Sequence, residues 1–149
     1  MTAAATEPLV HDRRTAELDP QTLLDLLTLR VDVFVVEQRC AYRELDGRDG
    51  EPATRHLWIA DQGGLPVAYL RLLDDGTARR IGRVVTRPDH RRRGLADRLM
   101  CRAVATSVGP WVLEAQAHLE GWYRQRGFAR TGDTYVDDGI PHVPMRRQA

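Results

Sequence analysis

The chain has 149 residues, of which 42% are apolar, so it can enclose one ordinary hydrophobic core but not a second of similar size. Its 22 basic and 21 acidic residues give a formal net charge of +1, which provides no general attraction to nucleic acid or to an anionic membrane. No apolar run resembles a secretory signal or a membrane span, and the two cysteines lack metal-ligand spacing. We therefore expect a single domain over residues 1–149, with a flexible segment at residues 1–9, a cytoplasmic location and no bound metal.

The first half of the chain predicts one helix followed by three strands. Asp19 and Pro20 precede apolar residues at three-to-four spacing, a pattern typical of a helix with an N-cap and a proline in its first turn. The β-branched residues at 33–36 leave the end of this helix open. Residues 39–52 are rich in charge and glycine and indicate a long functional loop. Three β-rich runs separated by turn sequences predict a meander of adjacent strands at residues 54–60, 66–73 and 80–86.

The second half predicts a longer helix, a strand, a short helix and a closing pair of strands. Residues 94–108 have one apolar face and end at Gly109-Pro110, which favours a helix. A strand is expected at residues 111–115, and a short helix at residues 118–126 that stops at Gly127. The closing strands are expected at residues 128–135 and 140–145, on either side of a turn at 137–139. This order of elements predicts a mixed α/β, or α+β, fold.

The most informative segment joins the third predicted strand to the second predicted helix. After Pro88, the sequence Arg91-Arg92-Arg93-Gly94-Leu95-Ala96 opens an amphipathic helix. A helix start presents free N–H groups and a partial positive charge, and glycine lets a phosphate approach the backbone closely. Such a basic run is more often a solvated turn, and it matches neither a Walker loop nor a Rossmann fingerprint. Its position between a strand and a helix nevertheless favours a pyrophosphate site.

Two motifs in this order resemble those of a known enzyme superfamily. The segment Val85-Thr86-Arg87-Pro88 with Arg91-x-x-Gly94-x-Ala96 is similar to the acetyl-CoA-binding motif of the GNAT N-acetyltransferases, and Tyr123-x-x-x-Gly127-Phe128 is similar to their closing motif. Four further stretches resemble the ElaA-like subfamily, at residues 33–38, 44–47, 115–119 and 138–142. The resemblance spans most of the chain from the first helix onward. It implies a mostly antiparallel, twisted sheet that is flanked by helices and splayed at the acyl-CoA site.

The resemblance also implies roles for individual residues. The main chain of one strand end would pair with the pantetheine arm of coenzyme A, and the arginine-glycine turn would hold the pyrophosphate. Tyr123 would protonate the thiolate as it leaves, which requires a donor close to sulfur. The alternative reading of Tyr123 is an ordinary aromatic core residue. The implied coenzyme-binding residues are Val84, Val85, Thr86, Arg91, Arg92, Arg93, Gly94, Leu95, Ala96, Gln116 and Tyr123.

The sequence leaves the general base and the acceptor site less defined. An attacking amine must lose a proton, so a base or a water relay is needed. Glu114 lies in Leu113-Glu114-Ala115, which resembles a strand of peptide N-terminal acetyltransferases whose glutamate is the base. Other groups that compete for this role are Glu37, Glu44, Asp46, His56, His118 and His142. Candidate acceptor-binding residues are Glu37, Asp46, His56 and Asp138, although aspartates beside glycines are equally ordinary in turns.

These features predict an enzyme that transfers acetyl from acetyl-CoA to a primary amine of a small molecule or peptide. A coenzyme A sensing module without catalysis is one alternative, and Tyr123 counts against it. An acyl-homoserine-lactone synthase is another, because residues 30–37 resemble the N-terminal helix of that family, although the chain is short for such an enzyme. We expect neither nucleic acid nor a membrane as a partner. The acceptor and the oligomeric state stay open, with a homodimer among the options.

Overall fold

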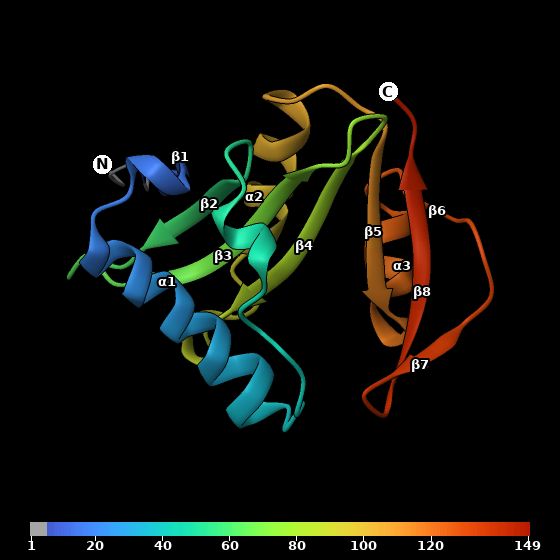
Figure 1. Ribbon diagram of the computed structural model, residues 1–149, viewed down its shortest axis with the longest axis horizontal. Coiled ribbons are helices and arrows are strands. Elements are labelled where there is room, and N and C mark those ends of the chain that lie inside the picture. The colour runs from blue at the N-terminus through green and yellow to red at the C-terminus, as the bar shows by residue number, and fades with distance from the viewer. Residues whose placement is uncertain (1–5) are drawn as a thin grey trace, which may run out of the picture.

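The computed structural model describes residues 6–149, which form a mixed α/β fold around one twisted sheet (Figure 1). Residues 1–5, which belong to the segment expected to be flexible, lie outside the described residues. The strands are β1 (His11–Arg14), β2 (Arg55–Ala60), β3 (Pro66–Asp74), β4 (Arg79–Thr86), β5 (Trp111–Gln116), β6 (Ala129–Arg130), β7 (Tyr135–Asp137) and β8 (Ile140–Arg147). The helices are α1 (Pro20–Val31), which continues as a wide π-helical segment at Asp32–Glu37, α2 (Leu95–Ala105) and α3 (Glu120–Arg124).

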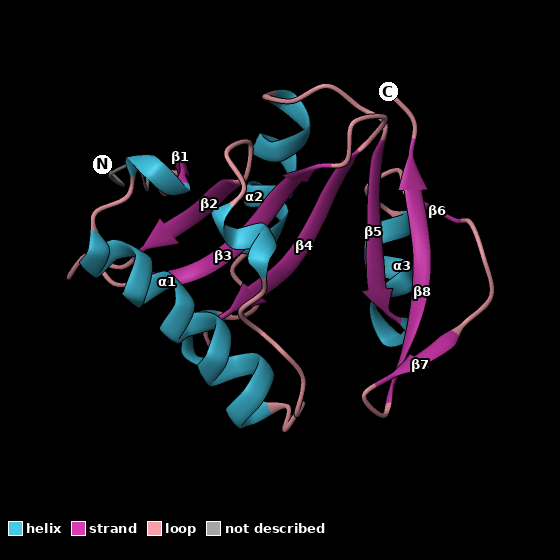
Figure 2. Ribbon diagram, in the orientation of Figure 1, coloured by secondary structure: helices cyan, strands magenta, loops and turns pink. Residues whose placement is uncertain are grey.

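The sheet has the order β1-β2-β3-β4-β5-β8-β6, and β7 pairs with β8. Its neighbours are antiparallel except for β4 and β5, which run parallel. Helix α1 packs on one face through Leu26 and Leu29, and α2 packs on the other through Leu99 and Met100 (Figure 2). The sheet thus lies between two apolar layers, as the mixed α/β prediction requires. Within residues 6–149, no helix is both long enough and apolar enough to span a bilayer.

Most predicted elements are confirmed, and the exceptions have local reasons. Asp19 caps α1 by accepting a hydrogen bond from the Thr22 N–H at 2.8 Å. The predicted meander is present as β2, β3 and β4. The prediction of one strand over residues 128–135 is wrong, because the chain pairs only at Ala129–Arg130 and turns through Gly132 before β7. The prediction also missed β1, an edge strand whose polar sequence has no alternating apolar pattern.

The splay expected from the family resemblance lies between β4 and β5. The two strands pair at only two positions, Arg79 with Trp111 and Arg80 with Val112, and then separate (Figure 2). Beyond these pairs the register of β4 shifts against β3, and Arg83 adopts a left-handed φ of 53° that side chains rarely accept. A bulge of this kind bends the bulged strand and increases its twist. The bulge therefore turns the end of β4 away from β5.

An ionic network ties the loop at residues 39–52 to the sheet. The Arg30 guanidinium, which is fully buried, donates to Glu44 at 2.8 Å and to Asp49 at 2.6 Å. On the sheet, Arg71 donates to Asp46 at 2.7 Å, and Arg83 lies 3.0 Å from Glu44. Buried charges are tolerated when they are paired in this way. The loop is therefore held on α1, β3 and β4 by three arginines and three carboxylates.

His56 was a candidate acceptor-binding residue, and the structure corrects this prediction. Its side chain is fully buried between α1 and the sheet, and it lines neither of the two cavities described below. Its Nδ1 lies 2.6 Å from the Tyr69 hydroxyl and its Nε2 lies 2.8 Å from the Thr15 hydroxyl, which itself donates to the Asp49 carbonyl. Thr15 can therefore only accept from Nε2–H, and Nδ1 accepts from Tyr69. Burial above all lowers the pKa of His56 to about 4 and keeps the ring neutral.

We expect His56 to make the fold sensitive to mild acid. Its folded pKa of about 4 lies below the value of about 6.5 for an unfolded chain, so between these values the unfolded chain binds a proton that the folded chain does not. Its contribution is present above pH 6.5 and is lost as the pH falls toward 4, and it amounts to about 2 kcal/mol between pH 7 and pH 5. Urea unfolding at several pH values should show a shallower loss for His56→Gln than for the parent. Equal slopes in the two proteins would contradict this prediction.

Candidate active site

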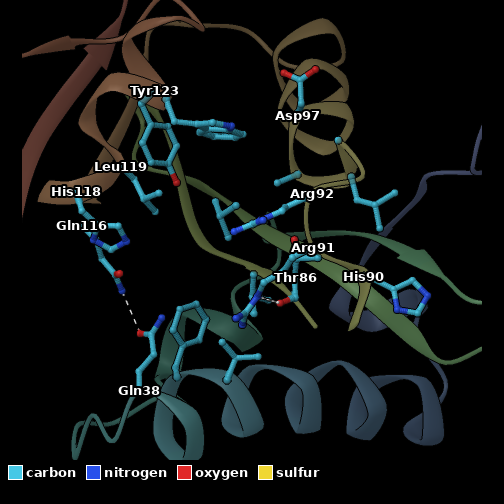
Figure 3. Close-up of a pocket in the computed structure, with 18 of the residues that line it drawn as sticks. Gln38, Thr86, His90, Arg91, Arg92, Asp97, Gln116, His118, Leu119 and Tyr123 are labelled. Atoms are coloured by element: carbon cyan, nitrogen blue, oxygen red, sulfur yellow. Dashed lines mark hydrogen bonds between the residues drawn. The ribbon is translucent and has the colours of Figure 1, made fainter. Parts of the chain in front are cut away.

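A cavity of about 460 Å³ opens where β4 and β5 separate (Figure 3). Its walls are the end of β4, the turn that leads into α2, the α3 helix with the turn before it, and the π-helical end of α1. The cavity brings together ten of the eleven residues predicted to bind the coenzyme. The exception is Arg93, whose side chain is exposed outside it.

The turn before α2 contains backbone N–H groups without a backbone partner, and Arg92 and Gly94 of this turn line the cavity. Arg92 and Gly94 both adopt left-handed φ angles, of 65° and 73°. The first hydrogen bond of the helix runs from the Arg98 N–H to the Gly94 carbonyl at 3.1 Å, so the earlier amides have no partner within the helix. Among the described residues, no backbone carbonyl accepts from the amides of Arg92, Arg93 or Gly94. This geometry suits an anion such as a phosphate.

The arginines around the turn differ in whether a carboxylate of the protein already pairs with them. Arg91 binds Glu37 through two contacts of 2.7 Å and donates to the Thr86 carbonyl at 3.0 Å. The hydrogen bonds from Arg91 lower the pKa of Glu37, which lines this cavity and not the acceptor side where we had expected it. Arg92 lines the cavity and has no carboxylate partner among residues 6–149. Arg92 is therefore the side chain most available to an anionic ligand.

Two residues of α3 and its C-terminal turn complete this wall and were missed by the sequence analysis. The Arg126 guanidinium stacks over the Trp122 ring at 3.6 Å and donates to Asp97 of α2 at 2.7 Å. Their four-residue spacing places both side chains on one face of the helical turn, which is the signal that could have found them. The stacked pair links α3 to the start of α2 across the cavity.

Tyr123 lies on the same wall, with 6% of its surface exposed. Its ring meets Trp122 and Phe128 edge-on, with centroid distances of 4.9 and 6.1 Å. The hydroxyl points into the cavity (Figure 3). Burial raises the pKa of Tyr123 to about 12, so the phenol keeps its proton at neutral pH. Tyr123 can therefore donate a hydrogen bond or a proton to a group bound in the cavity.

A second cavity, of about 220 Å³, lies between the middle of β4, β5, the loop after α1 and the β7–β8 hairpin. Gln38 and Gln116 line both cavities. The Gln116 side-chain amide donates to the Gln38 side-chain oxygen at 3.0 Å, which bridges the gap between α1 and β5 (Figure 3). The two glutamines thus mark the boundary between the cavities.

The predicted base and acceptor residues are distributed differently from our expectation. Glu114 lines the second cavity, where its carboxylate accepts from the Tyr135 hydroxyl at 2.8 Å and from Arg80 at 3.4 Å. Asp138 occupies the hairpin turn, and its neighbour Asp137 is the residue that lines the cavity. The charge of Asp46 is taken up by arginines in the ionic network. Of the predicted base and acceptor residues, Glu114 and His142 line the second cavity.

The fold and the cavity define a GNAT acyltransferase, and comparison with known proteins agrees. Residues 24–149 match the family model described as an acetyltransferase (GNAT) domain, so the chain belongs to this family. An acyl-CoA N-acyltransferase from Pseudomonas aeruginosa has a similar solved structure, with a TM-score of 0.87, 40% identity, and coverage of 94% of this chain and 99% of that one. The fold implies a substrate based on coenzyme A.

Within the family, the chain is similar to ElaA. The Escherichia coli protein ElaA is 38% identical over 148 residues, covering 93% of this chain and 95% of that protein. Its crystal structure matches with a TM-score of 0.88 and 36% identity, over 95% of this chain and 99% of that one. The UPF0039 protein Rv2851c of Mycobacterium tuberculosis is 49% identical over 137 residues, covering 88% of this chain and 87% of that protein. The predicted GNAT and ElaA-like resemblance is confirmed.

Gly94→Val should weaken coenzyme A binding by about a hundredfold without unfolding the protein. The new side chain would project into the open space in which we expect a phosphate to meet the amides, and the φ of 73° would strain it. Loss of two charge-assisted hydrogen bonds corresponds to about 3 kcal/mol, roughly a hundredfold in Kd. Calorimetric titration with coenzyme A measures the effect.

Gly64→Val is the matched control, because Gly64 has a φ of 87° and equally open surroundings in the β2–β3 turn, away from the cavity. Equal affinity in both variants would refute the phosphate site.

Proposed function

We propose that the protein transfers an acyl group, most simply acetyl, from coenzyme A to a primary amine of a small molecule or peptide. The observation that carries this proposal is the first cavity, which is lined by Arg92 and Gly94, whose amides have no backbone partner, and into which the hydroxyl of Tyr123 points. An anion site alone would fit many ligands. A neutral buried phenol near the same space suits the release of a thiol from its ester.

The coenzyme is proposed to bind along the first cavity from the turn to the splay. The amides at residues 92–96 and the Arg92 side chain hold the pyrophosphate. Each charge-assisted hydrogen bond contributes about 1.5 to 3 kcal/mol, so several together reach the roughly 8 kcal/mol of micromolar affinity. Beyond Arg80, the edge of β4 that faces β5 has no strand partner. The Arg87 N–H donates to the Val67 carbonyl of β3, and neighbouring residues of a strand turn their main-chain groups to opposite edges, so the groups of Val84 and Thr86 face the open edge and can pair with the amides of pantetheine. This path leads the thioester toward the boundary between the cavities.

The acceptor amine is proposed to enter through the second cavity. This cavity opens on the other side of the Gln38–Gln116 bridge, so an amine there would approach the acyl carbon from the side away from the phosphates. Glu114 and Asp137 are the carboxylates that line it. Within residues 6–149 Asp137 has no ion-pair partner, so it is the carboxylate best able to hold a cationic amine. These two residues replace Asp46 and Asp138 as candidates for acceptor binding.

A thiol-release assay with acetyl-CoA and a panel of amines tests the proposed function. The panel should contain polyamines, aromatic amines, amino acids and peptides with free N-termini. We expect thiol release that depends on one class of amine and a product whose mass increases by one acetyl group. Acetyl-CoA binding without amine-dependent thiol release would support the sensing module instead.

Tyr123→Phe should lower turnover and leave the affinity for acetyl-CoA unchanged. The hydroxyl acts on a thiolate that forms only as the carbon–sulfur bond breaks, so its loss affects the transition state and not the bound ground state. General acid catalysis contributes at least about a hundredfold, and kcat should fall by this amount when chemistry limits the rate. Calorimetry on the same variant provides the control for binding. If turnover is equal to that of the parent in single-turnover measurements, Tyr123 is a structural residue.

A further inference from the structure

His142 on β8 lies at the boundary between the two cavities. It lines the second cavity, and in the antiparallel pairing of β5 with β8 it stands directly opposite Gln116. Directly opposed residues on one face of such a pair have Cβ atoms about 4.5 to 5.5 Å apart. Gln116 lines both cavities, so His142 is next to the passage through which an amine would meet the acyl group.

The hydrogen bonding of His142 fixes which ring nitrogen carries the proton. Nδ1 lies 2.8 Å from the backbone carbonyl of Ile140. A carbonyl oxygen can only accept, so Nδ1 must donate, and in the neutral ring Nε2 then keeps a free lone pair. Among the described residues, no group forms a hydrogen bond to Nε2. The ring is also stacked on Tyr135 at a centroid distance of 5.8 Å and an angle of 22°, which limits its rotation.

Glu114 is less well placed for the same task. It stands opposite Pro144, two residues from Gln116 along β5, which corresponds to about 7 Å along a strand. Both of its carboxylate oxygens already accept hydrogen bonds, one from Tyr135 and one from Arg80. Its side chain is 44% exposed, so water competes for it as well. His142 is therefore closer to the boundary and has a free basic atom.

We propose that His142 is the general base of the acyl transfer, through Nε2. The proposal rests on the proposed function. An amine that arrives as a cation first loses one proton to solvent. As its neutral nitrogen then forms a bond to the acyl carbon, Nε2 takes one further proton from that nitrogen. The carbon–sulfur bond then breaks, its electron pair goes to sulfur, and sulfur takes the proton of the Tyr123 hydroxyl. Solvent returns a proton to Tyr123 and receives one from His142, so the cycle is balanced. Base and acid act from the two cavities on opposite sides of the Gln38–Gln116 bridge.

Two substitutions separate a basic role of His142 from a structural one. His142→Asn can still donate to the Ile140 carbonyl but has no basic nitrogen, whereas His142→Ala loses both. We expect kcat to fall by about a hundredfold or more in both variants, with an unchanged KM for acetyl-CoA. Added imidazole should restore part of the turnover of His142→Ala, because it supplies the missing base in the space left by the ring. Turnover is measured by thiol release with the amine that gives the highest rate in the parent protein.

The outcomes distinguish this proposal from the function on which it rests. Parent-like turnover in His142→Asn would mean that only the hydrogen bond to Ile140 matters, and would overturn the base assignment alone. A larger loss in Glu114→Gln than in His142→Asn would also overturn it, in favour of Glu114. Absence of amine-dependent thiol release in the parent would overturn the proposed function and this proposal together.

Discussion

The separation of β4 from β5 after two paired positions is the constraint on which the rest of the structure depends. A sheet normally satisfies its backbone groups by continuous pairing, and an unpaired edge inside a fold is costly unless something else pairs with it. Here the left-handed Arg83 and the register shift against β3 turn the end of β4 away. Two cavities lie along the gap that results, one at the end of β4 and the other beside its middle residues. The free edge of β4 can pair with a ligand.

The charged loop after α1 stabilises the gap between β4 and β5. Its carboxylates are bound by Arg30, Arg71 and Arg83, so the loop forms a fixed wall of the second cavity. Removing one member of such a buried network would leave an uncompensated charge, which is far more costly than losing an exposed pair. Arg83 belongs both to the network and to the bulge in β4. The position of the loop and the divergence of the strands are therefore coupled through one residue.

The boundary between the cavities separates two sets of chemical groups. The turn before α2, whose amides lack a backbone partner, and the phenol of Tyr123 lie on one side, and the imidazole of His142 with two carboxylates lies on the other. Gln38 and Gln116 meet between them through a single hydrogen bond. In the proposed reaction, a thioester and an amine enter from opposite sides and meet at this point without competing for space. The arrangement favours acyl transfer over simple binding of a nucleotide.

The sequence by itself determined the glycine-containing turn before α2, the closing aromatic motif and most of the element order. These features depend on residues that are neighbours in the chain, so propensity, spacing and capping suffice to predict them. Tertiary structure decided the roles of His56, Asp46 and Glu114, whose contacts come from segments far apart in the sequence. It also decided that β8 lies beside β5, which brings His142 opposite Gln116. Strand pairing and burial set the charge, exposure and partners of a side chain. These properties cannot be predicted from local sequence, because they depend on contacts between segments that are far apart in the chain.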